Sequence, residues 1–230
     1  MNPDERRLGF VMVEDSDDAR LFIELSSYAV DLVEARDALA LALALQSTAP
    51  ADSPLQSAER SLIANAAMAY CRTFVSSKVR RPMTTFVQIP ARVCATHDLV
   101  AKFRNRTIAH SQSDLSVTYA VGVLDADTHQ VLDVSAPSIS STMPPEQVRN
   151  FIELVAAVTA ELDDVIAPVR TRLMAKLAAA DRATLLEAGL SPTPRMLPAT
   201  EFGSPRSRPP YPTTHPIYLG DGNPPVSHGS

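Results

Sequence analysis

Three side chains in the middle of the chain carry the groups needed to cleave RNA without a metal ion: Arg104, Asn105 and His110. A histidine with a pKa near neutrality can take the proton from a ribose 2′-hydroxyl or supply one to the leaving oxygen. Arginine can hold a phosphate through two parallel hydrogen bonds, and asparagine can orient either partner. The structural alternative is that Arg104 and Asn105 only cap or pair, with His110 a cation stabilised by the helix dipole.

The spacing of Arg104 and His110 predicts that one regular helix cannot aim both at the same phosphate. They are six residues apart, so they point about 120° away from each other on a helix of 3.6 residues per turn. A broken last turn would bring them together, and so would a second copy of the helix packed across a two-fold axis. We therefore expect a homodimer in which two chains share one site.

The same segment lies in a basic block of an otherwise acidic protein. Residues 70–110 hold eight Lys or Arg and one acid, whereas the whole chain has a net charge of −5. Such a block either complements acidic helices within the fold or binds an anion such as an RNA phosphate, and the sequence leaves both open. Lys102, Arg106 and Arg72 are the candidates for binding substrate phosphates.

The pattern of apolar residues indicates a bundle of helices that positions this segment. Apolar side chains recur at spacings of three and four from residue 16 to the loop at Pro50, over residues 55–79 and 90–110, and again after Pro144. Between them the period changes to two, which predicts a β-hairpin over about residues 115–134. The predicted fold class is all-α: an antiparallel helical bundle over residues 16–190 with an inserted hairpin.

The two ends of the chain look different from this bundle. Residues 1–15 are expected to be flexible. Ten of the last forty residues are proline, mixed with Ser, Thr and Gly, which predicts a disordered tail over residues 191–230.

Other features of the sequence point to no cofactor, no metal and no membrane. There is no phosphate-binding glycine loop, no dinucleotide turn and no His/Cys cluster with metal-ligand spacing. The remaining histidines, among them His97, His129 and His215, are expected to be ordinary surface residues. The apolar runs are too short to span a bilayer, no secretory leader is visible, and two cysteines suit a reducing compartment, so we expect a cytoplasmic protein.

The segment Phe103–Ser111 resembles the signature of HEPN domains, in which an arginine, often followed by asparagine, precedes a histidine by four to six residues. Five residues intervene here, and the ending Ile-Ala-His-Ser is similar to that of abortive-infection-type members. The resemblance implies a helical bundle that dimerises through its motif helices, with Arg104, Asn105 and His110 as active residues. One departure is Gln112, because some members have a tyrosine there that a partner enzyme modifies.

What the resemblance implies about function is a metal-independent endoribonuclease. Such proteins act as toxins or antiviral defence effectors, and a neutralising antitoxin or regulatory protein is then a possible partner. Other members keep the fold and have lost the activity. The alternative is therefore a non-catalytic dimeric interaction or regulatory module, which the acidic overall charge favours because nucleic-acid affinity depends on cationic surface.

Overall fold

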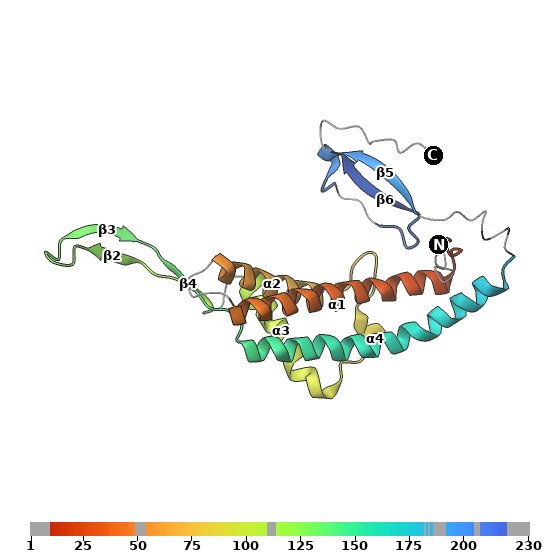
Figure 1. Cartoon of the computed structure of the whole chain (residues 1–230), viewed down its shortest axis with the longest axis horizontal. Helices are drawn as coiled ribbons and strands as arrows, with labels where there is room; N and C mark the ends of the chain where they lie inside the picture. Colours follow the sequence, from red (N-terminus) through yellow and green to blue (C-terminus); the bar gives the residue numbers. More distant parts are fainter. Residues whose placement is uncertain are drawn as a thin grey trace, which may run out of the picture. The chain divides into compact units, whose positions relative to one another are not determined.

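The computed structural model (Figure 1) describes residues 10–48, 54–109, 114–181, 183, 185, 192–204 and 208–219. Helices account for 59% of this structure and strands, in small sheets, for 14%. The prediction of an all-α fold is therefore wrong, and the chain is a mixed protein of helices and two-stranded sheets. The described strands form three two-stranded sheets, and the one nearest the C-terminus forms where the sequence predicts a disordered tail.

Contacts divide the chain into two compact units. One comprises residues 27–75 and 82–164, and the other residues 1–26, 76–81 and 165–230. None of the described helices combines the length and the hydropathy needed to cross a membrane.

Helix α1 (Asp17–Thr48) begins where the sequence predicts a helix start. The Ser16 hydroxyl accepts a hydrogen bond from the Ala19 amide at 3.3 Å, which satisfies one of the amides left free at the helix end. Asp17 and Asp18 add negative charge beside the positive end of the helix dipole. Local chemistry is therefore sufficient to set this boundary.

Helix α2 (Pro54–Arg72) ends seven residues before the predicted boundary at residue 79. The Thr73 hydroxyl donates to the Tyr70 carbonyl at 2.7 Å, and the Thr73 carbonyl accepts a hydrogen bond from the Met83 amide at 2.8 Å. These bonds turn the chain into a loop that leads to the short helix η1 (Met83–Thr85). A second short helix, η2 (Ala91–Val93), then leads directly into α3 (Cys94–Phe103).

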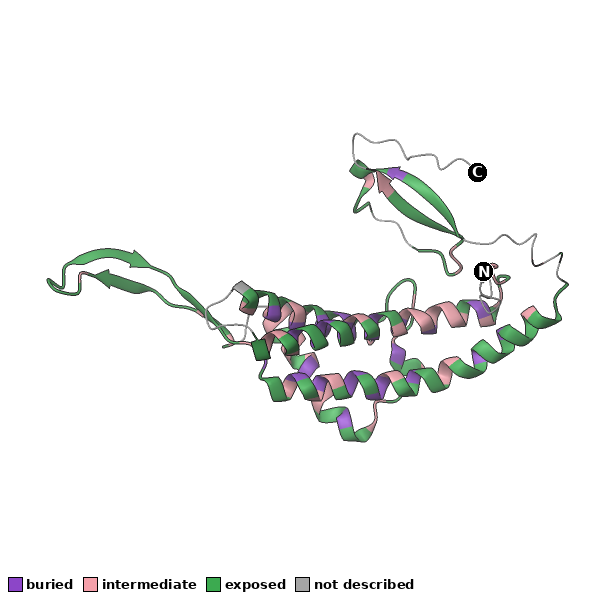
Figure 2. Ribbon diagram, in the orientation of Figure 1, coloured by how far each residue is buried: buried purple, intermediate pink, exposed green. Residues whose placement is uncertain are grey.

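The unit of residues 27–75 and 82–164 has a core of large side chains from α1, α2, α3 and α4 (Pro145–Ala179). Burial of these side chains removes apolar surface from water, which is the main stabilising contribution to such a bundle. Figure 2 shows the buried positions along the helices. The core includes Tyr28, Leu32, Leu39, Ile63, Tyr70, Val100, Phe151, Leu154 and Leu162.

One carboxylate at the edge of this core, that of Glu59, is almost fully buried, with 5% of the residue exposed. It accepts hydrogen bonds from the Gln46 amide at 2.7 Å and from the Thr142 hydroxyl at 2.6 Å. A buried charge is tolerated when hydrogen bonds replace its hydration. These contacts tie α1, α2 and the segment before α4 together.

The predicted hairpin is present and is longer than expected. Strand β1 (Ser116–Thr118) pairs antiparallel with β4 (Ser138–Ser140), and β2 (Val121–Leu124) pairs antiparallel with β3 (Val131–Ser135). In the turn, the Asp125 carboxylate accepts hydrogen bonds from the Asp127 and Thr128 amides, and His129 has a positive φ of 60°. Nearly every strand residue is exposed (Figure 2).

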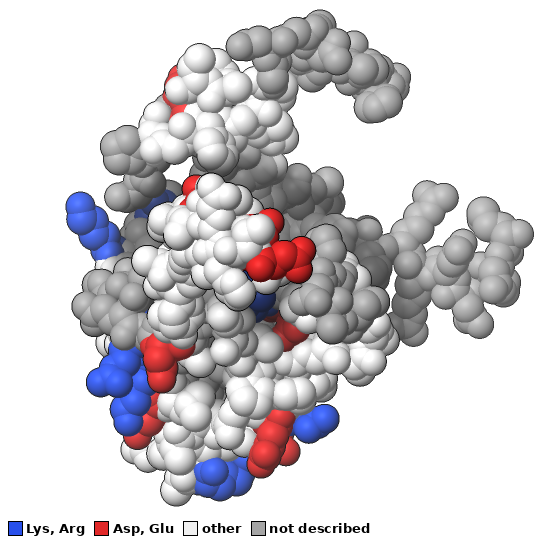
Figure 3. Space-filling view, turned by 90° about the vertical axis from the view of Figure 1, so that its left-hand side faces the viewer, with Lys and Arg blue, Asp and Glu red and all other residues white. Residues whose placement is uncertain are grey.

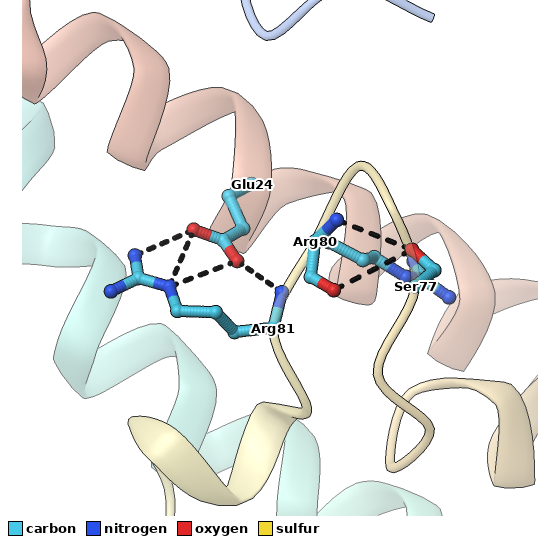
Figure 4. Close-up of polar contacts among 4 residues, drawn as sticks. All are labelled: Glu24, Ser77, Arg80 and Arg81. Carbon is cyan, nitrogen blue, oxygen red and sulfur yellow. Dashed lines mark hydrogen bonds and ion pairs between the residues drawn. The ribbon is translucent and has the colours of Figure 1, made fainter. Parts of the chain in front are cut away.

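The other unit includes the start of α1, the second half of α4 and the loop 76–81. Arg81 donates from its backbone amide and its guanidinium to the Glu24 carboxylate on α1, with the shortest contacts at 2.7 Å (Figure 4). Beside it, the Arg80 amide donates to the Ser77 hydroxyl at 3.2 Å and closes the loop. Arg172 on α4 pairs with Asp18 on α1 at 2.6 Å.

The C-terminal region corrects the prediction of a disordered tail over residues 191–230. Strand β5 (Thr193–Pro198) pairs in parallel with β6 (Thr214–Leu219), and the short helix η4 (Ala199–Glu201) lies between them in the sequence. Composition indicated that this segment cannot build a core, and among its described residues only Leu197 is buried. Backbone pairing and an edge-to-face contact of Phe202 with Tyr218 give it order without one. Residues 220–230 lie outside the described residues.

Candidate functional site

Arg104 and Asn105 begin η3 (Arg104–Ala109), a π-helical segment that directly continues α3. Of the helix predicted over residues 90–110, α-helical geometry ends at Phe103. The sequence leaves a broken last turn open as one of two arrangements, the other being a second copy of the helix. In a π-helix the hydrogen bonds run from residue i to residue i+5, so the angle worked out from 3.6 residues per turn does not apply here. Such segments are rare and occur often at functional sites.

The two polar side chains at this turn contact each other. Arg104 donates from Nη1 to Asn105 Oδ1 at 2.9 Å, Arg104 is half-buried, and Asn105 is exposed. Because a guanidinium has five N–H donors, this bond fixes its orientation and leaves the others for a ligand. Within the part of the chain that the structure describes, no carboxylate lies at ion-pair distance from Arg104.

Helix α2 supports the turn from one side, since it contacts both α3 and η3. Burial raises the pKa of the Cys71 thiol on α2 to about 11, and the positive charge of Arg104 acts in the opposite direction. The guanidinium therefore lies close enough to Cys71 for its positive charge to favour the thiolate form of this side chain. His110, the third predicted catalytic residue, lies outside the described residues, as do residues 111–113.

Arg72, a predicted phosphate ligand, is held instead by two carboxylates of α1. Its guanidinium donates to Asp31 Oδ1 from Nε at 2.8 Å and also binds Glu34, which in turn accepts from Asn65 Nδ2 at 3.1 Å. Asp31 is buried, with 6% of the residue exposed. A phosphate would have to compete with both carboxylates, so these contacts favour a structural role for Arg72.

The basic block is therefore divided between the two interpretations that the sequence leaves open. Arg72 and Arg81 pair with acids of α1. Lys102 and Arg106, the other predicted substrate ligands, are exposed and, like Arg104, have no carboxylate at ion-pair distance among the described residues. The described cations available to an external anion therefore include those that end α3 and begin η3, as well as the exposed Lys78 and Arg92.

Figure 3 shows basic and acidic side chains interspersed over the face it draws, with no large area of one sign among the described residues. On this face a nucleic acid would meet separate cations rather than a broad positive surface.

A cluster that sequence reasoning missed lies around His97 on α3. The Tyr70 hydroxyl is 2.9 Å from His97 Nδ1, and the Phe74 and His97 rings meet edge to face at 4.9 Å. Burial lowers the pKa of His97, so the neutral ring is favoured. A signal was present in the sequence: His97 lies four residues after Val93 and three before Val100, both buried. The cluster joins α2 to α3 just before the Arg104 turn.

No family model, curated protein or solved structure matches this chain. Among the described residues, no three His, Cys, Asp or Glu side chains gather closely enough to hold a metal ion.

Proposed function

We propose that this protein is a metal-independent endoribonuclease whose site is built on Arg104, Asn105 and His110. The observation that carries the proposal is the Arg104–Asn105 contact on the π-helical turn, which presents an oriented guanidinium that has no carboxylate partner among the described residues. A positioned, uncompensated arginine is the group that stabilises the extra charge of a phosphate transition state.

The chemical roles follow from the groups available. Arg104 binds the scissile phosphate, while Asn105 holds the guanidinium in place through its side-chain oxygen. His110 exchanges a proton with the ribose 2′-hydroxyl or with the leaving oxygen, a role taken from its position in the sequence. Lys102 and Arg106, both exposed, bind neighbouring phosphates of the strand.

The proposal includes a homodimer that pools these residues from two chains. It also includes action in the cytoplasm, in a toxin or antiviral defence role, with an antitoxin or regulatory protein as a further partner. The resemblance to HEPN domains supports these points. The free thiols of Cys71 and Cys94 are in keeping with a reducing compartment.

The test is cleavage of a mixed RNA panel in the presence of EDTA by the wild type, His110→Ala and Arg104→Ala. Removal of a positioned acid–base group should reduce the rate by about 10² to 10⁴-fold, and removal of a positioned charge donor by about 10² to 10³-fold. Products should end in a 2′,3′-cyclic phosphate if the ribose hydroxyl is the nucleophile. His129→Asn is the matched control, because asparagine tolerates the positive φ of this exposed turn. Equal rates for His110→Ala and the wild type would refute the assignment.

A specific observation favours a second function, that of a non-catalytic interaction module. The hairpin exposes large apolar side chains: Val131, Leu132, Val134 and Ile139 are each more than 60% exposed. Exposed apolar groups gathered on one element are typical of a protein interface. This function predicts that Val134→Asp abolishes self-association or partner binding, measured by sedimentation, in a protein that cleaves no RNA.

A further inference from the structure

The C-terminal module, which we define as residues 192–204 and 208–219, surrounds a cavity of about 770 Å³. The residues that line it include Arg195, Arg208 and His215, together with Ser204, Thr214 and Tyr218. Among the described residues, no acidic one lines it; the one acid of the module, Glu201, lies on η4. Four prolines, Pro192, Pro209, Pro212 and Pro216, also line it. The cavity therefore combines a largely apolar wall with the positive charge of two arginines.

Strand pairing explains how residues distant in sequence meet at this cavity. In the parallel pair of β5 and β6, Arg195 is opposite Pro216 and Leu197 is opposite Tyr218. Because side chains alternate along a strand, Arg195 and Tyr218 lie on the same face of the pair. Arg208 comes from the segment that connects η4 to β6 and completes the lining.

The two arginines form no ion pair among the described residues. Neither Arg195 nor Arg208 is at ion-pair distance from a described carboxylate, and both are exposed. Burial raises the pKa of Tyr211 in the module, and the acids Asp15 and Glu14 lie near enough to add to this shift. Two cations that share a cavity without acids repel each other and attract an anion. A phosphate group matches both the charge and the planar donor arrangement of arginine.

An aromatic pair, the exposed Phe202 and the half-buried Tyr218, lies next to these cations. Phe202 is 77% exposed, the highest value among the exposed large apolar side chains of the described chain, and its ring meets Tyr218 edge to face at 5.2 Å. Tyr218 itself lines the cavity. Exposed aromatic rings beside cationic groups are the combination that binds single-stranded nucleic acid, in which bases stack while phosphates pair with arginine. A phosphorylated peptide would use the arginines but not the rings.

We infer that the C-terminal module binds single-stranded RNA, with Arg195 and Arg208 on the phosphates and Phe202 and Tyr218 stacking on bases. The inference rests on the proposed function only in the choice of RNA over DNA. It adds a binding site built from residues other than Arg104, Asn105 and His110.

The experiment measures binding of the full-length His110→Ala protein to a fluorescent single-stranded RNA of about ten nucleotides, a length within the usual site size for one such module. Arg195→Gln/Arg208→Gln should weaken binding and reduce the slope of log K against log salt by about 1.4, since each phosphate contact on a single strand contributes about 0.7. Phe202→Ala should weaken binding by about 5- to 150-fold, the factor that corresponds to loss of one stacked base. Arg195 and Arg208 are exposed, so their replacement should not change the melting temperature. The melting temperature of Phe202→Ala is compared with that of the wild type, because the Phe202 ring also contacts Tyr218 and helps to order the module.

The control is Arg149→Gln/Arg170→Gln, which removes the same charge from exposed positions of α4. Equal weakening by the control and by Arg195→Gln/Arg208→Gln would overturn the inference. So would binding of inorganic phosphate at these arginines without binding of the oligonucleotide. Cleavage by proteins that retain His110 separates this inference from the proposed function. Arginine-dependent binding without cleavage supports the inference and contradicts the nuclease, whereas cleavage with no effect of the module variants contradicts the inference alone.

Discussion

Substitution of Arg72 tests whether this residue stabilises the fold or binds substrate. In Arg72→Gln the buried Asp31 carboxylate loses its guanidinium contacts at 2.6 and 2.8 Å. The Asp31 side chain is 9% exposed, whereas that of Arg72 is 46% exposed, so solvent screens one partner only. A charged group that loses a hydrogen-bond partner in a buried site costs about 1–3 kcal/mol, and an exposed pair such as that with Glu34 contributes less than about 1 kcal/mol.

We therefore expect Arg72→Gln to lower the free energy of unfolding by about 2 kcal/mol, which in a chain of this size lowers the melting temperature by roughly 4–8 °C. Urea denaturation followed by circular dichroism measures the free energy. The control is Arg36→Gln, because Arg36 pairs with Asp37 while both side chains are more than half exposed. That variant should change stability by less than about 0.5 kcal/mol.

A double-mutant cycle sharpens the result. When Arg72→Gln is combined with Asp31→Asn, the free energy of unfolding should decrease by less than the sum of the decreases in the two single variants. The reason is that the buried charge is removed together with its partner. A wild-type free energy of unfolding in Arg72→Gln would refute a stabilising role for Arg72. If this variant keeps its stability and also loses RNA binding, Arg72 is a phosphate ligand instead.

Two further predictions concern titratable groups on α2 and α3. Because burial lowers the pKa of His97, the unfolded chain binds this proton more readily than the folded chain. The contribution of His97 to the free energy of unfolding should therefore be constant above about pH 6.5, the unfolded-state pKa. Below that pH the free energy of unfolding should fall, by no more than about 1.4 kcal/mol per pH unit, until the lower folded-state pKa is reached. Thermal melts at several pH values check this, and His97→Phe should flatten the pH dependence of the melting temperature below about pH 6.5. An unchanged slope in this variant would assign the pH dependence to another titratable group. At pH 8, iodoacetamide should label the exposed Cys94 before Cys71, whose thiol pKa is raised to about 11. Arg104→Ala should slow labelling of Cys71 further, as judged by peptide mass spectrometry, and faster labelling would contradict the proximity of the two side chains.

The candidate site was predictable from the sequence in its residue types but not in its geometry. Arg104 and Asn105 adjoin in sequence, so their contact follows from local structure. We find no marker in the sequence for the change from α- to π-helix at Arg104, and the segment after it contacts both α2 and α3. Arg72 looked equivalent to Arg106 in a basic block, yet Arg72 alone of the two is held by α1 acids about forty residues earlier in the chain.

Short-range chemistry determined the elements themselves. Ser16 with the following acids starts α1, and the alternation of apolar residues makes the hairpin, since each signal acts within a few residues. Tertiary structure alone decided which charges are neutralised, that His97 is half-buried against Tyr70, and that two proline-rich segments pair as β5 and β6. Each of these depends on partners 20 or more residues away, so no local pattern encodes it.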